Sequence, residues 1–232
     1  MEYLPGGFTL ELAEGCFPFS TDSVVLSYFA HLPKNARVLD LGSGGGTLGL
    51  LLCANDKTCR VTGIERDPIA HNCALENIRR NAVADRMESI CADLRSVPSE
   101  ITPGSFHCVI SNPPYFSGGP ASHTLTTARR EDCCSAAELM HTAARALKYG
   151  GDFYLVHRPE RLAELIALAS ANGMEAKRLG LMRHKENGPI TLILLQFRKG
   201  GKPGLVFEEF FLYNADNTPS DTYRKIYHMQ ED

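Results

Sequence analysis

The chain has 232 residues, of which 44% are hydrophobic and 22% charged, and its formal net charge is −3. This length suits one large α/β domain, or two small ones. No apolar run reaches the roughly 18 residues of a membrane span, and the N-terminus lacks the basic and apolar regions of a signal peptide. We therefore expect one domain over residues 1–232, located in the cytoplasm, with an N-terminal segment over 1–34, a core over 35–200 and a tail over 201–232.

The charge is unevenly distributed along the chain. Residues 141–205 hold 11 Lys and Arg against five Asp and Glu, a net +6, and the remainder holds 13 against 22, a net −9. A positive segment on an acidic chain suits a partner rich in phosphate, although a mixture of solvated helix faces accounts for it equally well. The eight cysteines form no C-x-x-C pair, so we expect structural thiols and no metal site.

Hydrophobic periodicity and turn residues predict helices that alternate with short strands. The expected helices cover residues 22–31, 47–54, 67–81, 135–147 and 159–172. The expected strands cover residues 36–40, 60–65, 87–92, 106–111, 152–157, 175–183 and 190–198, and the tail over 204–213 allows one short strand more. We expect Gly150 and Gly151 to close the fourth helix, Gly173 to end the fifth, and residues 115–134 to form a long loop.

This order of elements is typical of a doubly wound α/β fold. It predicts a mostly parallel, seven-stranded Rossmann-like sheet with a C-terminal antiparallel hairpin. Ligands of such sheets bind outside the carboxyl ends of the strands, where the strand order reverses. The motifs below each follow a strand, so we expect them to meet at that edge.

A glycine-rich loop, Gly42-Ser43-Gly44-Gly45-Gly46, follows the first strand. Glycines let the backbone approach a ligand closely and adopt positive φ. A P-loop is excluded because Thr47 follows without a preceding lysine, and a dinucleotide-binding pattern fits only loosely. Asp40, directly before the loop, would repel a pyrophosphate and suits the cationic amino-acid end of S-adenosylmethionine.

Acidic residues also follow the next two strands. Glu65 ends its strand about 20 residues beyond the loop, where a carboxylate can accept hydrogen bonds from ribose hydroxyls. Asp93 follows the next strand, in a position where aspartate is also common as a turn or cap residue. An exposed acid at a strand end is the alternative interpretation of Glu65.

The tetrapeptide Asn112-Pro113-Pro114-Tyr115 follows the strand over 106–111. Two successive prolines fix φ and remove two donors, so the local carbonyl groups are held rigidly. The Asn112 side-chain oxygen and the Pro113 carbonyl can then accept both hydrogens of one planar –NH2 group, and Tyr115 can stack on the substrate. Such a site needs no strong base and works by positioning and charge stabilisation. In isolation the tetrapeptide could equally be a rigid turn, but beside the glycine loop it indicates N-methyl transfer.

The loop D-L-G-S-G-G-G resembles the first motif of the class I S-adenosylmethionine-dependent methyltransferases, and N-P-P-Y resembles that of enzymes acting on adenine N6, guanine N2 or glutamine amides. With the segments 17–23, 128–131 and 157–162, these motifs resemble the bacterial tRNA(Val) adenine-N6 methyltransferase family over about residues 15–201. The motifs alone leave the acceptor open. The other classes usually carry an additional N-terminal, duplicated or target-recognition domain that this sequence does not indicate.

The resemblance implies S-adenosylmethionine as cofactor, tRNA as partner, and N6-methylation of the adenosine beside the anticodon by a monomer. Another RNA, a protein glutamine or a non-catalytic binding role are the alternatives. The implied catalytic residues are Asn112, Pro113, Pro114 and Tyr115. The implied cofactor contacts are Thr21, Asp22, Asp40, Gly42, Ser43, Gly44, Glu65, Arg66, Asp93, Leu94 and Asn112. The implied substrate contacts are Tyr115, Phe116, Arg129, Arg130 and Arg158. Helix capping explains Thr21 and Asp22 as well, and surface ion pairs explain the arginines.

Overall fold

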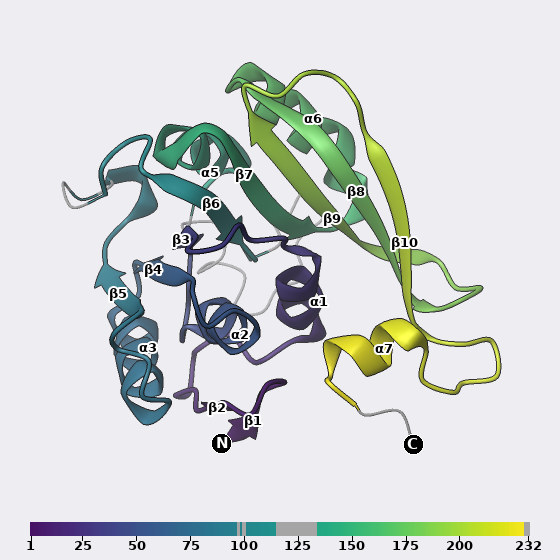
Figure 1. Ribbon diagram of the computed structural model, residues 1–232, viewed down its shortest axis with the longest axis horizontal. Coiled ribbons are helices and arrows are strands. Elements are labelled where there is room, and N and C mark those ends of the chain that lie inside the picture. The colour runs from purple at the N-terminus through teal and green to yellow at the C-terminus, as the bar shows by residue number, and fades with distance from the viewer. Residues whose placement is uncertain (97, 99–100, 115–133, 230–232) are drawn as a thin grey trace.

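The computed structural model describes residues 1–96, 98, 101–114 and 134–229 (Figure 1). Eight of its strands form one sheet, and a two-stranded hairpin lies at the N-terminus. The strands of the large sheet are β3 (Arg37–Leu41), β4 (Arg60–Glu65), β5 (Met87–Cys91), β6 (Phe106–Ser111), β7 (Leu147–His157), β8 (Met174–Lys185), β9 (Ile190–Lys199) and β10 (Val206–Tyr213). The hairpin consists of β1 (Glu2–Tyr3) and β2 (Thr9–Leu10).

The strand order in the sheet is β10-β8-β9-β7-β6-β3-β4-β5. The strands β5, β4, β3, β6 and β7 are parallel, β9 runs antiparallel to both β7 and β8, and β10 runs parallel to β8. The predicted doubly wound, mostly parallel sheet with an antiparallel hairpin is thus confirmed. The sheet has eight strands rather than seven, because residues 206–213 form a full edge strand along β8.

Helices cover both faces of the sheet. They are α1 (Thr21–Phe29), α2 (Thr47–Asn55), α3 (Pro68–Arg80), α5 (Ala136–Ala146), α6 (Leu162–Ala171) and α7 (Asp221–Ile226), with 3-10 turns η1 (Leu94–Ser96) and η2 (Pro159–Arg161). The helices α1, α2, α3 and α7 pack in one hydrophobic cluster, and α5 and α6 pack in the other (Figure 1). All five expected helices are present. The six-residue α7 and the hairpin β1–β2 were not predicted, because such short elements carry little periodicity.

Alternation along β3 determines which way its side chains point. Val38 belongs to the cluster under α1 and α2, and Leu39 and Leu41 belong to the cluster under α5 and α6. Successive side chains of a strand point to opposite faces, so Asp40 lies on the same face as Val38. This places a carboxylate in the apolar layer beneath α1 and α2, and Asp40 is only 1% exposed.

One predicted helix ending is wrong. Helix α5 ends where β7 begins, so Gly150 and Gly151 lie inside β7 and do not close the helix. Gly150 has a φ of 78°, and a Cβ on Gly151 would lie 2.8 Å from the His107 carbonyl oxygen. Glycine is therefore required by the irregular start of β7 against β6. Gly173 does follow α6 with a φ of 71°, as predicted.

The cationic segment over residues 141–205 does not form one patch, because β8 and β9 run in opposite directions. Its members therefore divide between two edges of the sheet. Arg145, Lys148, Lys177, Arg178, Arg198, Lys199 and Lys202 belong to the amino edge, and Arg158, Arg161, Arg183 and Lys185 belong to the carboxyl edge. Several also make structural ion pairs, such as Arg198 with Asp152 at 2.8 Å.

Arg178 joins β8 to β10 and α1. Its guanidinium donates to the Glu208 carboxylate at 2.5 and 3.0 Å and to the Phe29 carbonyl at 2.9 Å. It also lies 4.1 Å from the centroid of the Phe29 ring. The side chain is only 14% exposed, so these bonds are largely shielded from water.

We expect Arg178→Met to lower the free energy of unfolding by about 1.5–3 kcal/mol, because it leaves Glu208 and the Phe29 carbonyl without their charged donor. Urea denaturation measures this loss. Lys177→Met is the matched control, since the neighbouring ammonium donates to the Lys202 carbonyl at the surface, and we expect a change within about 0.5 kcal/mol. Equal losses in the two variants would contradict the role of Arg178.

Candidate active site

The carboxyl ends of β3, β4 and β6 meet at one edge of the sheet. Parallel register aligns the ends of β3 and β4, and the Ser111 hydroxyl donates to the Leu41 carbonyl over 2.7 Å. Gly42 and Asn112 come directly after β3 and β6, and Glu65 is the last residue of β4. The strand order reverses at β3, which has β4 on one side and β6 on the other. This is the place where ligands bind in doubly wound folds.

The glycine loop is folded back by hydrogen bonds to β4. The amides of Gly42 and Ser43 both donate to the Ile64 carbonyl, at 2.9 and 3.0 Å. Gly42 and Gly44 have φ values of 74° and 55°, which other residues rarely adopt. A Cβ on either glycine would meet no atom within 4 Å. The loop therefore leaves open space beside its backbone, as a ligand cradle requires.

Glu65 is held against this loop by its carboxylate. One oxygen accepts from the Gly44 amide at 2.8 Å and the other accepts from the Asp67 amide at 2.7 Å. Each carboxylate oxygen has a second lone pair, so Glu65 can still accept hydrogen bonds from a ligand hydroxyl. Its position is the one predicted from the sequence.

Asp40 is a buried carboxylate, and removing its charge from water costs free energy. Neither of its carboxylate oxygens makes a well-formed hydrogen bond with the described residues, although the Gly49 amide lies close enough to favour the ionised form slightly. Burial, and secondarily the nearby Glu65 charge, raise the pKa of Asp40 to about 8. Buried carboxylates are normally paired or hydrogen-bonded. A cationic ligand group beside Asp40 would relieve this cost, because it favours the ionised form.

Asp93 lies between two arginines. Both of its oxygens accept from the Arg95 guanidinium, with 3.0 Å to Nε, and Arg66 lies 3.9 Å away. Arg95 accounts for most of the lowering of the Asp93 pKa. Asp93 also accepts from the Arg95 amide at 2.9 Å, which is the turn role that the sequence allowed. Arg95 was not singled out from the sequence, although its spacing from Asp93 is typical of such a turn. Leu94 begins η1 beside them.

Asn112 is oriented by α1. Its side-chain amide donates to the Ser23 hydroxyl at 3.0 Å, and Ser23 is buried in the first turn of that helix. The bond occupies the NH2 side of the amide and leaves the side-chain oxygen as an acceptor. Pro113, which follows, is buried. Ser23 was not singled out from the sequence, although it lies in the quoted segment 17–23.

Thr21 and Asp22 belong to the same turn of α1. The Thr21 hydroxyl lies 3.4 Å from the Tyr227 hydroxyl of the segment after α7. Both residues line a hollow with C-terminal aromatic residues. The first turn of α1 therefore touches the reaction motif on one side and the C-terminal segment on the other.

The end of β7 adds two residues to this edge. Arg158 follows the strand and donates to the Thr191 carbonyl at 3.3 Å. His157 before it is buried, and burial lowers its pKa to about 4, so it is neutral near pH 7. The expected site residues Tyr115, Phe116, Arg129 and Arg130 lie outside the described residues.

Comparison with known proteins decides the family. The family described as "Methyltransferase small domain" matches residues 20–171. The chain belongs to this family. A Bacteroides fragilis protein named tRNA1(Val) (adenine(37)-N6)-methyltransferase is 31% identical to it over 180 residues, which cover 76% of this chain and 75% of the relative.

Further relatives extend over more of this methyltransferase. A protein of the same name from Actinobacillus pleuropneumoniae serotype 7 is 25% identical over 213 residues, covering 89% of this chain and 87% of the relative. The resemblance to the bacterial tRNA(Val) adenine-N6 methyltransferases is thus confirmed. The structure is also similar to that of a predicted O-methyltransferase of Agrobacterium tumefaciens, with a TM-score of 0.75, 21% identity and coverage of 90% of this chain and 96% of the other. At that identity the likeness shows the fold.

Two features are absent from the described part of the methyltransferase. No helix within it is long and apolar enough to cross a membrane. In the same residues, no group of three or more His, Cys, Asp and Glu side chains could hold a metal ion.

We expect Asp40→Asn to change how the stability of the ligand-free methyltransferase depends on pH. Asp40 has a pKa of about 8 in the folded chain and an ordinary value of 3.8. Between these values the folded state holds a proton that the unfolded state has lost, so stability falls as the pH rises. The loss is at most about 1.4 kcal/mol per pH unit, or about 4 kcal/mol from pH 5 to 8.

Urea unfolding at pH 5 and pH 8 measures this difference. The free energy of unfolding of the wild type, minus that of Asp40→Asn, should be smaller at pH 8 than at pH 5. The titration of His157 contributes equally to both proteins and cancels. The exposed Glu14, changed to Gln, serves as control and should follow the wild type. If the free energy of unfolding depends on pH in the same way in the wild type and in Asp40→Asn, then burial does not raise the pKa of Asp40.

Proposed function

We propose that this enzyme methylates the N6 amine of an adenosine in tRNA, using S-adenosylmethionine, and that adenosine 37 of tRNA1(Val) is its substrate. The observation that carries the proposal is the orientation of Asn112 by Ser23, directly beside the glycine loop. The relatives that bear the name tRNA1(Val) (adenine(37)-N6)-methyltransferase support the choice of substrate. We further propose that residues 1–232 act as a single domain in the cytoplasm.

The edge of the sheet fits S-adenosylmethionine. The unpartnered carboxylate of Asp40 suits its cationic amino-acid end, and the open side of Gly42 and Gly44 suits a close backbone approach. Glu65 has acceptor capacity left for the ribose hydroxyls. We assign the remaining cofactor contacts to Ser43, Arg66, Asp93 and Leu94, with Thr21 and Asp22 near the methionine end. When bound, S-adenosylmethionine supplies an electrophilic methyl group.

Asn112 and Pro113 act on the acceptor. The Asn112 side-chain oxygen accepts one hydrogen of the exocyclic amine, and the Pro113 carbonyl accepts the other. These bonds hold the amine so that its lone pair points at the methyl group, and they stabilise the positive charge that develops on nitrogen. The nitrogen then loses one proton to solvent, so no strong base is needed. Pro114 keeps the backbone rigid, and Tyr115 stacks on the base.

The RNA approaches the same edge. We assign Arg158, at the end of β7, to RNA phosphate, and Phe116, Arg129 and Arg130 complete the proposed substrate contacts. An adenosine in an anticodon loop is already partly unpaired, so placing it in the site costs less than extruding a base from a duplex.

We expect Asn112→Ala to lower the rate of methyl transfer at least 100-fold, because the amine loses its orienting acceptor. The cofactor dissociation constant should change less than threefold, since Asp40, Glu65 and the glycine loop remain. Radiolabelled S-adenosylmethionine supplied to total tRNA, total rRNA and protein, followed by nucleoside analysis, identifies the acceptor. N6-methyladenosine in tRNA supports the proposal, whereas label in N2-methylguanosine or in glutamine would replace it.

We expect Ser23→Ala to lower kcat about 5- to 10-fold with an unchanged cofactor dissociation constant, because one hydrogen bond that positions Asn112 is lost. Ser23→Thr keeps the hydroxyl and should restore most of the rate. Ser27→Ala is the matched control, since its hydroxyl lies in the same helix and donates to the Val24 carbonyl. If both alanine variants slow transfer equally, Ser23 supports the helix and does not position Asn112.

A further inference from the structure

Four aromatic side chains form a continuous row that begins at the carboxyl ends of β8 and β10 and continues along α7. The ring centroids are 5.1 Å apart for His184 and Tyr213, 5.3 Å for Tyr213 and Tyr223, and 4.6 Å for Tyr223 and Tyr227. Each ring is tilted by 38° to 49° from the next. We call these four residues the aromatic row. His184 is exposed and the three tyrosines are partly exposed.

The aromatic row lies at the same edge of the sheet as Asn112. The strands β8, β7 and β6 point in the same direction, and their register brings Ser111 level with Leu179, so His184 lies five residues beyond that level along β8. Asn112 and His184 are therefore about 14 Å apart across three strand spacings and about 13 Å apart along the strands, or roughly 20 Å in all. This distance corresponds to about six stacked nucleotides. The row is therefore within reach of nucleotides that flank a base held at Asn112.

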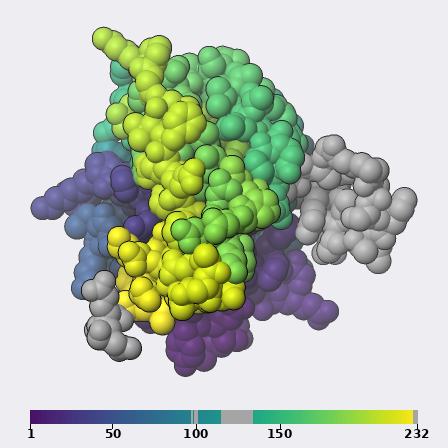
Figure 2. Space-filling view, turned by 90° about the vertical axis from the view of Figure 1, so that its right-hand side faces the viewer, coloured from purple at the N-terminus to yellow at the C-terminus, as the bar shows by residue number. Residues whose placement is uncertain are grey.

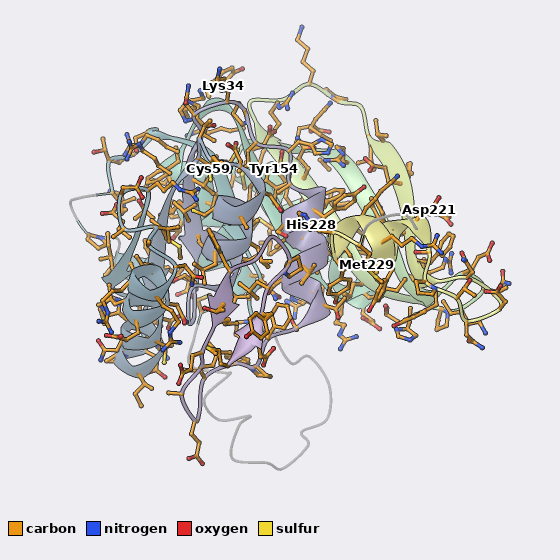
Figure 3. The ribbon with its side chains drawn as sticks, turned by 60° about the horizontal axis from the view of Figure 1, so that its bottom comes forward. Lys34, Cys59, Tyr154, Asp221, His228 and Met229 are labelled. Carbon is orange, nitrogen blue, oxygen red and sulfur yellow. The ribbon has the colours of Figure 1, made fainter. Side chains whose placement is uncertain are left out.

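The first turn of α1 connects the two places. Ser23 bonds to Asn112, and two residues earlier Thr21 reaches the Tyr227 hydroxyl. Figure 3 shows α7, which carries the labelled Asp221, directly beside α1. In Figure 2 the C-terminal residues, in yellow, lie against green residues of the β8–β9 hairpin and purple residues of the N-terminal part.

The row forms one wall of a hollow of about 230 Å³. The other walls include Thr21, Asp22, Arg183 and Thr191. Pockets for drug-sized ligands run from roughly 300 to 1,000 Å³, so this hollow suits a single planar ring system. Aromatic rings bind unpaired bases of any sequence by stacking, and the polar groups of the hollow can contact a base edge.

Cationic side chains flank the hollow. Arg183 and Lys185 end β8, and Arg224 and Lys225 lie on α7. Two of them pair with acids, since Arg183 lies 3.9 Å from Glu209 and Arg224 lies 3.4 Å from Asp221. Their positive charge suits the phosphates on either side of a bound base. A purely apolar partner would make no use of these cations.

We propose that the aromatic row binds an unpaired nucleobase of the substrate RNA, a few nucleotides from the base that is methylated. The inference rests on the proposed function, because it takes an RNA loop as the substrate. Stacking in the row would hold the loop open while the target base occupies the site at Asn112. It would also favour a single-stranded loop over a duplex, whose bases are not available for stacking.

The test measures binding of two synthetic RNAs to the full chain by fluorescence anisotropy: an anticodon stem-loop of tRNA(Val), and a fully base-paired hairpin of the same length. We expect Tyr223→Leu and His184→Ala each to raise the dissociation constant of the stem-loop about 5- to 50-fold. Affinity for the paired hairpin, cofactor affinity and melting temperature should change little. The salt dependence of binding should also keep its slope, because stacking releases no counterions.

Tyr223→Phe keeps the ring and should bind the stem-loop like the wild type. Phe207→Leu is the matched control, because Phe207 is a 65% exposed aromatic residue at the other end of β10. Equal stem-loop affinity in Tyr223→Leu, His184→Ala and wild type would overturn the inference. An equal loss for the paired hairpin would also overturn it, because the row would then not be reading unpaired bases.

Failure of the two proposals can be told apart. If the wild type methylates the stem-loop and the row variants bind it normally, the row is not an RNA site and the proposed function stands. If the wild type transfers no methyl group to any RNA, the proposed function fails and the inference about the row fails with it.

Discussion

The position of β3 between β4 and β6 is the constraint on which the site depends. Parallel strands on both sides bring three strand ends to one edge, and the Ser111–Leu41 hydrogen bond joins two of them. Motifs that are far apart in the sequence then become neighbours without any long loop. The same alternation that builds the core points Asp40 into the apolar layer under α1 and α2. The strand pattern that stabilises the sheet therefore also buries the Asp40 carboxylate, which costs free energy. This carboxylate lies at the place where a cationic ligand is needed.

Burial of Asp40 lowers the stability of the folded protein at a functional position. Burial raises the pKa of the group to about 8, which favours its protonated form in the ligand-free protein. A cation that binds beside it recovers interaction energy that the folded chain alone does not obtain. Glu65 differs, because two backbone amides already hold it. Hydrogen bonds thus hold the Glu65 carboxylate in place, whereas the Asp40 carboxylate gains its stabilising interaction when a cationic ligand binds.

Helix α1 connects the chemistry to the C-terminal segment. Its first turn contacts Asn112 through Ser23 and Tyr227 through Thr21. A helix is about 10–12 Å across with its side chains, so these contacts bring two distant parts of the chain to opposite sides of one element. The C-terminal segment is in turn held by β10, whose Glu208 pairs with Arg178. The position of the aromatic row therefore depends on β10, the eighth strand of the sheet.

The sequence alone determined the class of fold, the five longer helices, and the strand ends at which Asp40, Glu65, Asp93 and Asn112 lie. It did so because these features depend on local patterns: alternation, helical periodicity, and glycine or proline at turns. The sequence did not predict short elements such as α7, or the place of Gly150 and Gly151 inside β7, because these features depend on neighbours far along the chain. Only the tertiary structure divided the cationic segment between two edges, since the antiparallel turn of β8 and β9 separates residues that are close in sequence. It also brought Ser23 to Asn112 and assembled the aromatic row, because contacts over such separations follow from strand order and helix packing, which no local pattern encodes.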